Sequence, residues 1–136
     1  MILFDSSIWI DHFNRQSNQK SNFLSVLMLG QQKVLITPTI VQEVLQGFSN
    51  ASFFDIAQIV LTEQHFLDYD LVEAAIDAAK LYANLRKKGV TIRKSNDCLI
   101  AAYALHFDVE LCHNDSDFDL IAVHTAMKVW KPSQKI

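Results

Sequence analysis

The chain has 136 residues, half of them apolar and a fifth charged, with a formal net charge of −3. This length predicts a single domain over residues 1–136, and the apolar content excludes a largely disordered chain. With only three glycines and two prolines, a turn-rich all-β fold is disfavoured.

The sequence also bears on the compartment in which the protein works. No stretch reaches the ~18 apolar residues of a membrane span, and the first five residues lack the basic start of a signal peptide. Cys98 and Cys112 are too few for a disulfide framework and lie in apolar stretches, which favours buried, structural thiols in a reducing environment. We therefore expect a cytoplasmic protein without membrane association.

Short apolar runs alternate with helical patterns in the first half of the chain. Ile2–Phe4 is typical of a buried strand, and Ser6 or Ser7 is a suitable N-cap for the helix that follows. Thr37 before Pro38 is a strong helix start. The other expected elements are strands over 34–36 and 64–67 and helices over 23–29 and 51–61.

The second half continues the alternation. Asp70 begins the most regular helical pattern, which runs to about Lys87 and ends before Gly89. Asn96 is expected to cap a central helix over 97–106 that is apolar on nearly all sides. Strands are expected over 110–112 and 128–130, and residues 130–136 carry no interpretable pattern. This order predicts an α/β three-layer sandwich, in which a parallel sheet of about four to five short strands lies between helices.

Four carboxylates occupy informative places in this scheme. Asp5 and Asp115 follow strands, Asp97 opens the central helix, and Glu43 lies at the edge of an apolar helix stripe. Ligands of open parallel sheets bind beyond the carboxyl ends of the strands, where Asp5 and Asp115 emerge. A buried Glu43 needs a neutralising partner, and the chain from 34 to 79 offers no Lys or Arg.

Mg²⁺ or Mn²⁺ would meet this need, because both prefer oxygen ligands and support hydrolysis of phosphodiesters. The residues alone leave a second interpretation open, in which Asp5 and Asp115 are surface turn acids and Asp97 is a helix cap. None of the five histidines has a metal-ligand spacing, and His113 is notable only for its place beside the acids.

Charge is distributed unevenly along the chain. Seven acids and no basic residue lie between Lys33 and Lys80, whereas a stretch without acids between Asp77 and Asp97 holds half of the twelve Lys and Arg residues. This basic window consists of Lys80, Arg86, Lys87, Lys88, Arg93 and Lys94. It indicates either a polyanionic partner or an ordinary solvated helix end and loop.

Four segments together resemble PIN-domain ribonucleases, and among them VapC-like toxins of bacterial toxin–antitoxin pairs. They are ILFDSSIWID (2–11), TPTIVQEVLQG (37–47), NDCLIAAYAL (96–105) and HNDSDFD (113–119). Each motif alone is weak, but their order and spacing match over essentially the whole chain. The resemblance implies a parallel sheet between helices, and a metal site for Mg²⁺ or Mn²⁺ made by Asp5, Glu43, Asp97 and Asp115, with Asp117 as a further ligand. It also implies a homodimer, an antitoxin partner and an RNA substrate such as tRNA.

We therefore expect a metal-dependent endoribonuclease that acts as a toxin. Asp5, Asp97 and Asp115 would ligate the ion, Glu43 would complete the site or position the attacking water, and Ser6 would orient Asp5 or hold a water. RNA phosphates would contact Arg86, Lys87, Lys88, Arg93 and Lys94. The rival hypothesis is a binding module that holds RNA or a partner without cleavage, its acids serving to receive an arginine.

Overall fold

The structure, a computed structural model, describes residues 1–132 and is built on a parallel sheet. Five strands lie in the order β3-β2-β1-β4-β5. They are β1 (Ile2–Phe4), β2 (Leu35–Ile36), β3 (His65–Phe66), β4 (Glu110–Cys112) and β5 (Lys128–Val129). Leu3 on the central strand pairs with Leu35 on one side and Leu111 on the other. The predicted short-stranded parallel sheet is confirmed.

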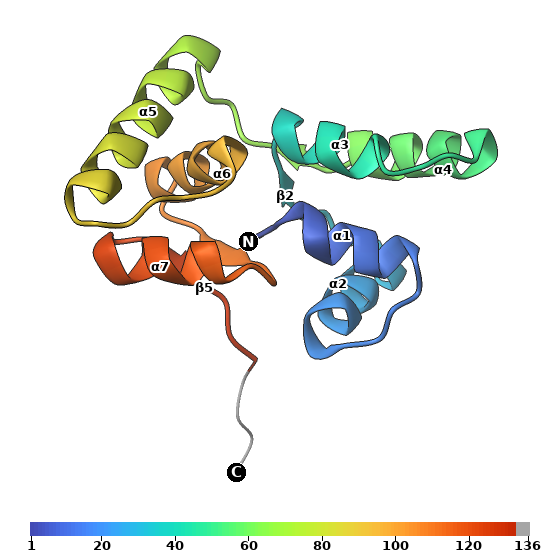
Figure 1. Ribbon diagram of the computed structural model, residues 1–136. Helices are drawn as coiled ribbons and strands as arrows, with labels where there is room; N and C mark the ends of the chain where they lie inside the picture. Colours follow the sequence, from blue (N-terminus) through green and yellow to red (C-terminus); the bar gives the residue numbers. More distant parts are fainter. Residues whose placement is uncertain (133–136) are drawn as a thin grey trace.

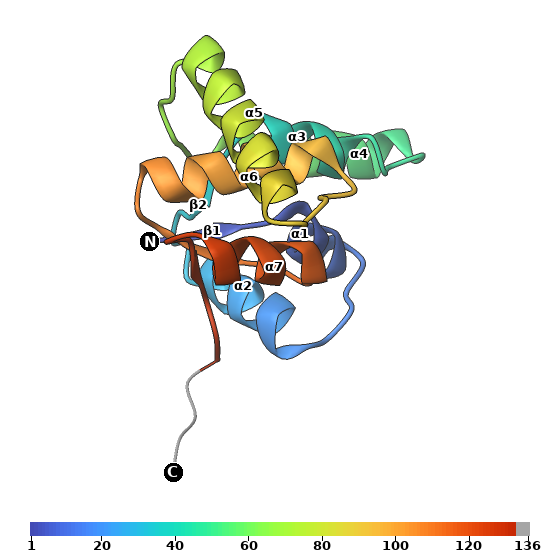
Figure 2. The same cartoon turned by 60° about the vertical axis from the view of Figure 1, so that its left-hand side comes forward.

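Helices cover both faces of the sheet, so the predicted three-layer arrangement is also confirmed (Figure 1). They are α1 (Ser6–Phe13), α2 (Gln19–Leu29), α3 (Pro38–Leu45), α4 (Ala51–Thr62), α5 (Leu71–Lys87), α6 (Ser95–His106) and α7 (Ser116–His124). Figure 2 shows α3, α4, α5 and α6 on one side of the strands, and α2 and α7 on the other.

The buried core is one cluster that includes residues of both β1 and α6. Leu3 and Phe4 of β1 and Ile100 and Ala101 of α6 have no exposed surface. As its all-round apolar sequence predicts, α6 packs between α5 on one side and α3 and α7 on the others. Burial of such side chains stabilises the fold by roughly 25 cal/mol per Å² of apolar surface.

Helix starts are where the structure differs most from the expectations. Thr37 and Asp70 are N-caps as predicted, but α1 is capped by Asp5 and not by Ser6 or Ser7. Helix α6 begins at Ser95 after Lys94, so Asn96 lies within its first turn and does not cap it. Helix α2 begins at Gln19, before the expected residue 23, because Asn18 and Ser21 form a reciprocal capping box.

Helix α7 was not expected, and it changes the setting of the last acids. The sequence predicts no element between the strands over 110–112 and 128–130, whereas Asp115 caps α7 and Asp117 and Asp119 lie in its first turn. Of the uninterpreted segment 130–136, residues 133–136 lie outside the described part of the chain. Trp130 stacks on Phe23 with ring centroids 4.6 Å apart.

The topology brings the acids to one edge. From β1 the sheet continues through β2 and β3 in one direction and through β4 and β5 in the other, so strand order reverses between β1 and β4. Asp5 follows β1, and Asp115 follows β4 after two residues. Both therefore lie at the reversal point, where ligands of open α/β sheets bind. Across residues 1–132, no helix combines the length and apolarity needed to cross a membrane.

Candidate active site

Asp5 is fixed at the end of β1 by its role as a helix cap. It is only 5% exposed, and its Oδ2 accepts a hydrogen bond from the Ser7 hydroxyl at 2.9 Å. The Ser6 hydroxyl lies 3.5 Å from the other carboxylate oxygen. Ser6 is thus placed beside Asp5 as expected, although Ser7 makes the shorter contact.

Three further carboxylates converge on one point. Asp97, Asp115 and Asp117 each offer an oxygen, and these oxygens lie within 4.8 Å of one another. Asp97 comes from the first turn of α6, whereas Asp115 and Asp117 come from the start of α7. The Asp117 backbone N–H donates to Asp115 Oδ1 at 2.9 Å, which fixes the spacing of these two residues.

Asp5 and Glu43 do not belong to this trio but lie beside it. Burial raises the pKa of Glu43, and the charge of Asp5 raises it further, while Ser6, Asn96 and Lys94 oppose the change. Burial also raises the pKa of Asp97, to about 7, and the charges of Asp115, Asp5 and Glu43 add to this effect. The charges of the other three predicted acids thus all act on Asp97.

Two oxygens of the site are buried without a hydrogen-bond partner. They are Oε1 of Glu43 and Oδ2 of Asp97. Isolated buried carboxylate oxygens are costly, and nearly all such groups in proteins are paired or bound to an ion. The oxygen-only donor set and these unpaired atoms fit a hard divalent cation held by the acids.

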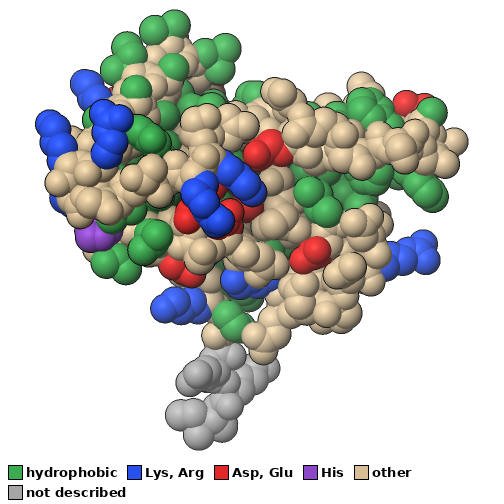
Figure 3. All heavy atoms as spheres, viewed as in Figure 1, with side chains coloured by type: hydrophobic (Ala, Val, Ile, Leu, Met, Phe, Trp, Pro, Cys, Tyr) green, Lys and Arg blue, Asp and Glu red, His purple; other side chains and the backbone are tan. Residues whose placement is uncertain are grey.

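The basic window divides between two places in the fold. Arg86 and Lys87 lie in the last turn of α5 and Lys88 follows as its C-cap, whereas Arg93 and Lys94 precede α6 and reach the acids. Arg93 Nε lies 3.3 Å from Asp117 Oδ2, and Lys94 Nζ lies 3.8 Å from Asp115 Oδ2. Figure 3 shows Lys and Arg side chains over a cluster of acids near the centre of this face.

His113 is the residue of this region to which the sequence assigned no role. It follows β4 directly and is only 2% exposed. Its Nδ1 accepts a hydrogen bond from the Asp115 N–H at 3.1 Å, and its Nε2 lies 3.2 Å from Asp119 Oδ1. Burial lowers the pKa of His113, so the neutral imidazole is favoured. Its place at a strand end, two residues before a site acid, was the available signal.

A groove that none of the site acids lines opens between the α1–α2 region and the α3–α4 region, at the ends of α1 and α3. It has a volume of about 1100 Å³, and its apolar lining includes Phe13, Met28, Phe48, Phe53 and Ile56. Phe53 and Ile56 are more than half exposed. An exposed apolar surface of this kind is typical of a protein–protein contact.

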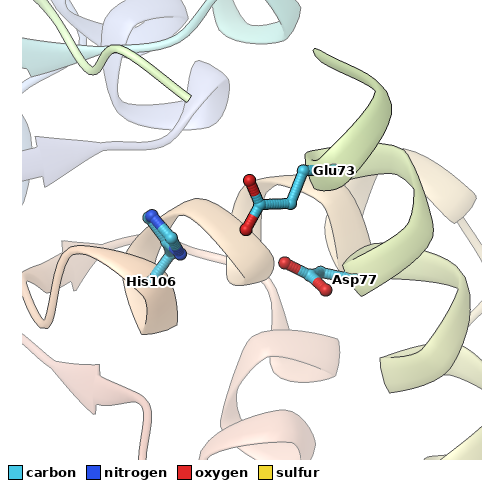
Figure 4. Close-up of side chains that lie close together, drawn as sticks. All are labelled: Glu73, Asp77 and His106. Carbon is cyan, nitrogen blue, oxygen red and sulfur yellow. The ribbon is translucent and has the colours of Figure 1, made fainter. Parts of the chain in front are cut away.

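A second group of possible ligands lies between α5 and α6 (Figure 4). Glu73, Asp77 and His106 offer ligand atoms within 4.8 Å of one another, but Glu73 and His106 are exposed. Asp77 accepts a hydrogen bond from the Tyr69 hydroxyl, and the Tyr69 ring stacks on His106 with centroids 4.1 Å apart. Packing between the helices accounts for this group, which we do not assign as a site.

Similarity to known proteins agrees with the geometry. A model of the PIN domain matches residues 2–123, and the chain belongs to this family. Ribonuclease VapC11 of Mycobacterium tuberculosis (strain H37Rv) is 31% identical over 126 residues, covering 90% of this chain and 92% of the relative. This similarity places the chain with VapC ribonucleases, and the resemblance stated from the motifs is confirmed.

Solved structures share the fold at lower identity. VapBC2 from Rickettsia felis, bound to a DNA fragment from its promoter, matches with a TM-score of 0.71 at 20% identity, over 96% of this chain and 100% of that chain. VapBC-1 from nontypeable Haemophilus influenzae matches with a TM-score of 0.69 at 20% identity, over 96% and 97% of the respective chains.

Proposed function

We propose that this protein is a metal-dependent endoribonuclease that acts as the toxin of a toxin–antitoxin pair in the cytoplasm. The observation that carries the proposal is the convergence of Asp97, Asp115 and Asp117 within 4.8 Å at the reversal point of the sheet. Membership in the PIN family and the similarity to VapC ribonucleases support the same activity.

Mg²⁺ or Mn²⁺ is the proposed cofactor. Asp5, Asp97 and Asp115 are proposed to hold it, with Asp117 as a further ligand and Glu43 either completing the site or holding the attacking water. When bound, such an ion lowers the pKa of a water molecule and neutralises charge on the phosphoryl group. The unpaired oxygens of Glu43 and Asp97 support this assignment.

The side chains of this protein have distinct tasks in that reaction. Ser7 and Ser6 hold the Asp5 carboxylate in one orientation. Glu43, whose pKa is raised by burial and by Asp5, is suited to accept a proton from water. Water attacks phosphorus directly, so no side chain forms a covalent bond to RNA.

RNA is proposed to approach over the basic residues. Arg93 and Lys94 are exposed and lie directly beside the acids, where a phosphate next to the cleaved bond would be placed. Arg86, Lys87 and Lys88 lie earlier in the chain, at the end of α5, and would contact phosphates outside the site. A structured RNA such as tRNA is the proposed class of substrate.

An antitoxin and a second copy of this chain are the proposed protein partners. The groove between the α1–α2 and α3–α4 regions is concave and partly apolar, as expected for a surface that receives a helix or tail of an antitoxin. Leu71, Val72 and Ile76 expose apolar surface on α5, which suits the interface of a symmetric homodimer. Light scattering on the purified chain measures that oligomeric state.

Cleavage of RNA by the purified protein tests the central proposal. We expect cleavage with Mg²⁺ or Mn²⁺, none after chelation, and none from Asp97→Asn with either ion. Asp55→Asn is the matched control, because Asp55 is an exposed acid on α4 far from the trio in sequence. If the wild-type protein binds RNA and both ions but never cleaves, the chain is a binding module.

A further inference from the structure

His113 makes contacts that reach two acids of α7. Its Nδ1 accepts from the Asp115 backbone N–H, so the ring proton must lie on Nε2. That nitrogen lies 3.2 Å from Asp119 Oδ1, and its surroundings bury it completely without hydrogen-bond geometry to any partner. The ring therefore faces an amide hydrogen on one side and a carboxylate on the other.

The position of the ring is itself fixed. It packs against the fully buried Phe118, with ring centroids 5.1 Å apart. The backbone carbonyl of His113 accepts a hydrogen bond from the Lys20 ammonium on α2. Directly before it, Cys112 at the end of β4 accepts from the Asp5 N–H at 2.9 Å. His113 thus joins the end of the sheet to the beginning of α7.

We propose that His113 is a positioning residue that sets the orientation of Asp115 in the acidic site. Asp115 is held from two directions: its backbone by the His113 ring, and its Oδ1 by the Asp117 N–H. Without the ring acceptor, the Asp115 N–H would be left unpaired and the short loop before α7 could rotate. The proposal deepens the proposed nuclease function, on which its catalytic consequence rests.

A matched pair of variants at His113 separates the effect of losing the hydrogen-bond acceptor from the effect of changing the shape of the side chain. Asn places an oxygen close to the position of Nδ1, whereas Leu has nearly the same shape as Asn and accepts no hydrogen bond. Residues that orient metal ligands typically change metal affinity by about 10- to 100-fold when they are replaced. We expect His113→Leu to weaken Mn²⁺ binding at least about tenfold and to lower kcat. We expect His113→Asn to stay within about threefold of the wild type in both.

Calorimetric titration of Mn²⁺ into each chelator-treated variant is the first measurement, with cleavage kinetics as the second. The KM for RNA should change less than kcat, because the ring is only 2% exposed and cannot itself contact RNA. Equal losses in His113→Asn and His113→Leu would overturn the proposal, as would unchanged Mn²⁺ binding by a folded His113→Leu.

A measurement on the wild-type protein does not depend on either variant folding. Long-range ¹H–¹⁵N spectra of the imidazole should show one tautomer, with Nδ1 unprotonated and hydrogen on Nε2. The Nε2 signal should shift in Asp119→Asn. A proton on Nδ1, or rapid exchange between tautomers, would overturn the proposal. Failure of the wild type to bind Mn²⁺ would instead count against the proposed function, while the tautomer remains measurable.

Discussion

Asp97 has a buried Oδ2 with no hydrogen-bond partner and lies close to three other carboxylates. Its pKa is raised to about 7 from 3.8, first by burial and then by the charges of Asp115 and Asp5. Repulsion between carboxylates ~4 Å apart costs about 1 kcal/mol per pair even in water, and more inside a protein. The site therefore opposes its own ionisation unless a cation is present.

The first prediction concerns stability without metal. Between pH 4 and 7, folded Asp97 keeps a proton that the unfolded chain has released, so the free energy of unfolding should fall as pH rises across this window. Asp97→Asn cannot lose this proton, and its dependence on pH should be shallower, with higher stability than the wild type at pH 7.5. Urea denaturation in chelator at pH 5.5 and 7.5 measures this.

Asp55→Asn is the control for that comparison, because it removes an exposed carboxylate on α4. Its stability should keep the pH dependence of the wild type. An Asp97→Asn protein that is less stable at pH 7.5 than the wild type would show that the carboxylate stabilises the fold by contacts that do not require a metal.

At the residue scale, the expectation that acids follow buried strands located Asp5 and Asp115, but it did not identify the cations that pair with the site acids. Asp5 and Asp115 could be placed because an apolar run followed by an acid marks the end of a buried strand. The ion pairs of Arg93 and Lys94 with Asp115 and Asp117 were missed, since these residues are about twenty positions apart in sequence. The sequence predicted RNA contacts for these two cations, a role that remains a prediction.

Among the elements, α5 and the segment after it distribute positive charge over two surfaces. Arg86 and Lys87 extend from the last turn of α5, where cations also interact favourably with the helix dipole. Gly89 then turns the chain toward α6. Its φ of 81° is a backbone conformation that residues other than glycine rarely adopt. Arg93 and Lys94 consequently face the acids, whereas Arg86, Lys87 and Lys88 lie at the far end of this loop.

The second prediction tests the α5 end as an RNA surface. Each phosphate contact on a single strand contributes about 0.7 to the slope of log affinity against log salt. Replacing both Lys87 and Lys88 by Ala should flatten this slope by up to about 1.4 and weaken binding to all sequences alike. Binding can be measured with Asp97→Asn as the background, so that cleavage does not interfere.

Lys33→Ala is the matched control, because Lys33 is an exposed lysine just before β2. It should leave the slope unchanged. A slope that is the same in the double variant and the wild type would mean that the α5 end faces solvent or a protein, which is the alternative that the sequence left open.

Element boundaries show why α7 could not be predicted. Its segment begins with three acids within five residues, and only Phe118 and Ile121 of its apolar residues are fully buried. Such a short and weakly periodic helix is defined by its cap at Asp115 and by packing on α6 and β5. The start of α6 was misplaced for a related reason, since no side chain caps it.

At the scale of the whole molecule, three features bear on how an antitoxin would inhibit the protein. They are the site acids, the groove, and the acidic block between Glu43 and Asp77. The block contains no Lys or Arg, and Asp55, Glu63, Asp68, Asp70 and Glu73 within it are exposed. A basic antitoxin segment would meet a surface of opposite charge there. The single-domain organisation over residues 1–136 remains a prediction at this scale.

The acidic site already accepts a guanidinium from this chain itself. Arg93 lies 3.3 Å from Asp117 through Nε and 3.8 Å from Asp115 through Nη2. An arginine suits such carboxylates because its planar fork can bind two oxygens at once. An arginine supplied by an antitoxin tail that extends from the groove to the acids would compete for the oxygens that are proposed to hold the metal.

The third prediction follows from that competition. If an antitoxin arginine occupies the acids, inhibition should weaken as Mg²⁺ or Mn²⁺ rises, because cation and guanidinium require the same oxygens. Titrating either ion into the purified toxin–antitoxin complex, with RNA cleavage as the readout, measures the effect. Replacing the antitoxin arginines by Gln should lower the concentration of metal that restores cleavage, whereas Lys in their place should have a smaller effect.

Inhibition that stays constant over a wide range of metal, with those arginines dispensable, would mean that the antitoxin covers the RNA-binding face at a distance from Asp97 and Asp115. Light scattering at each metal concentration distinguishes the two cases further, since loss of inhibition by competition at the acids need not release an antitoxin that is also held in the groove.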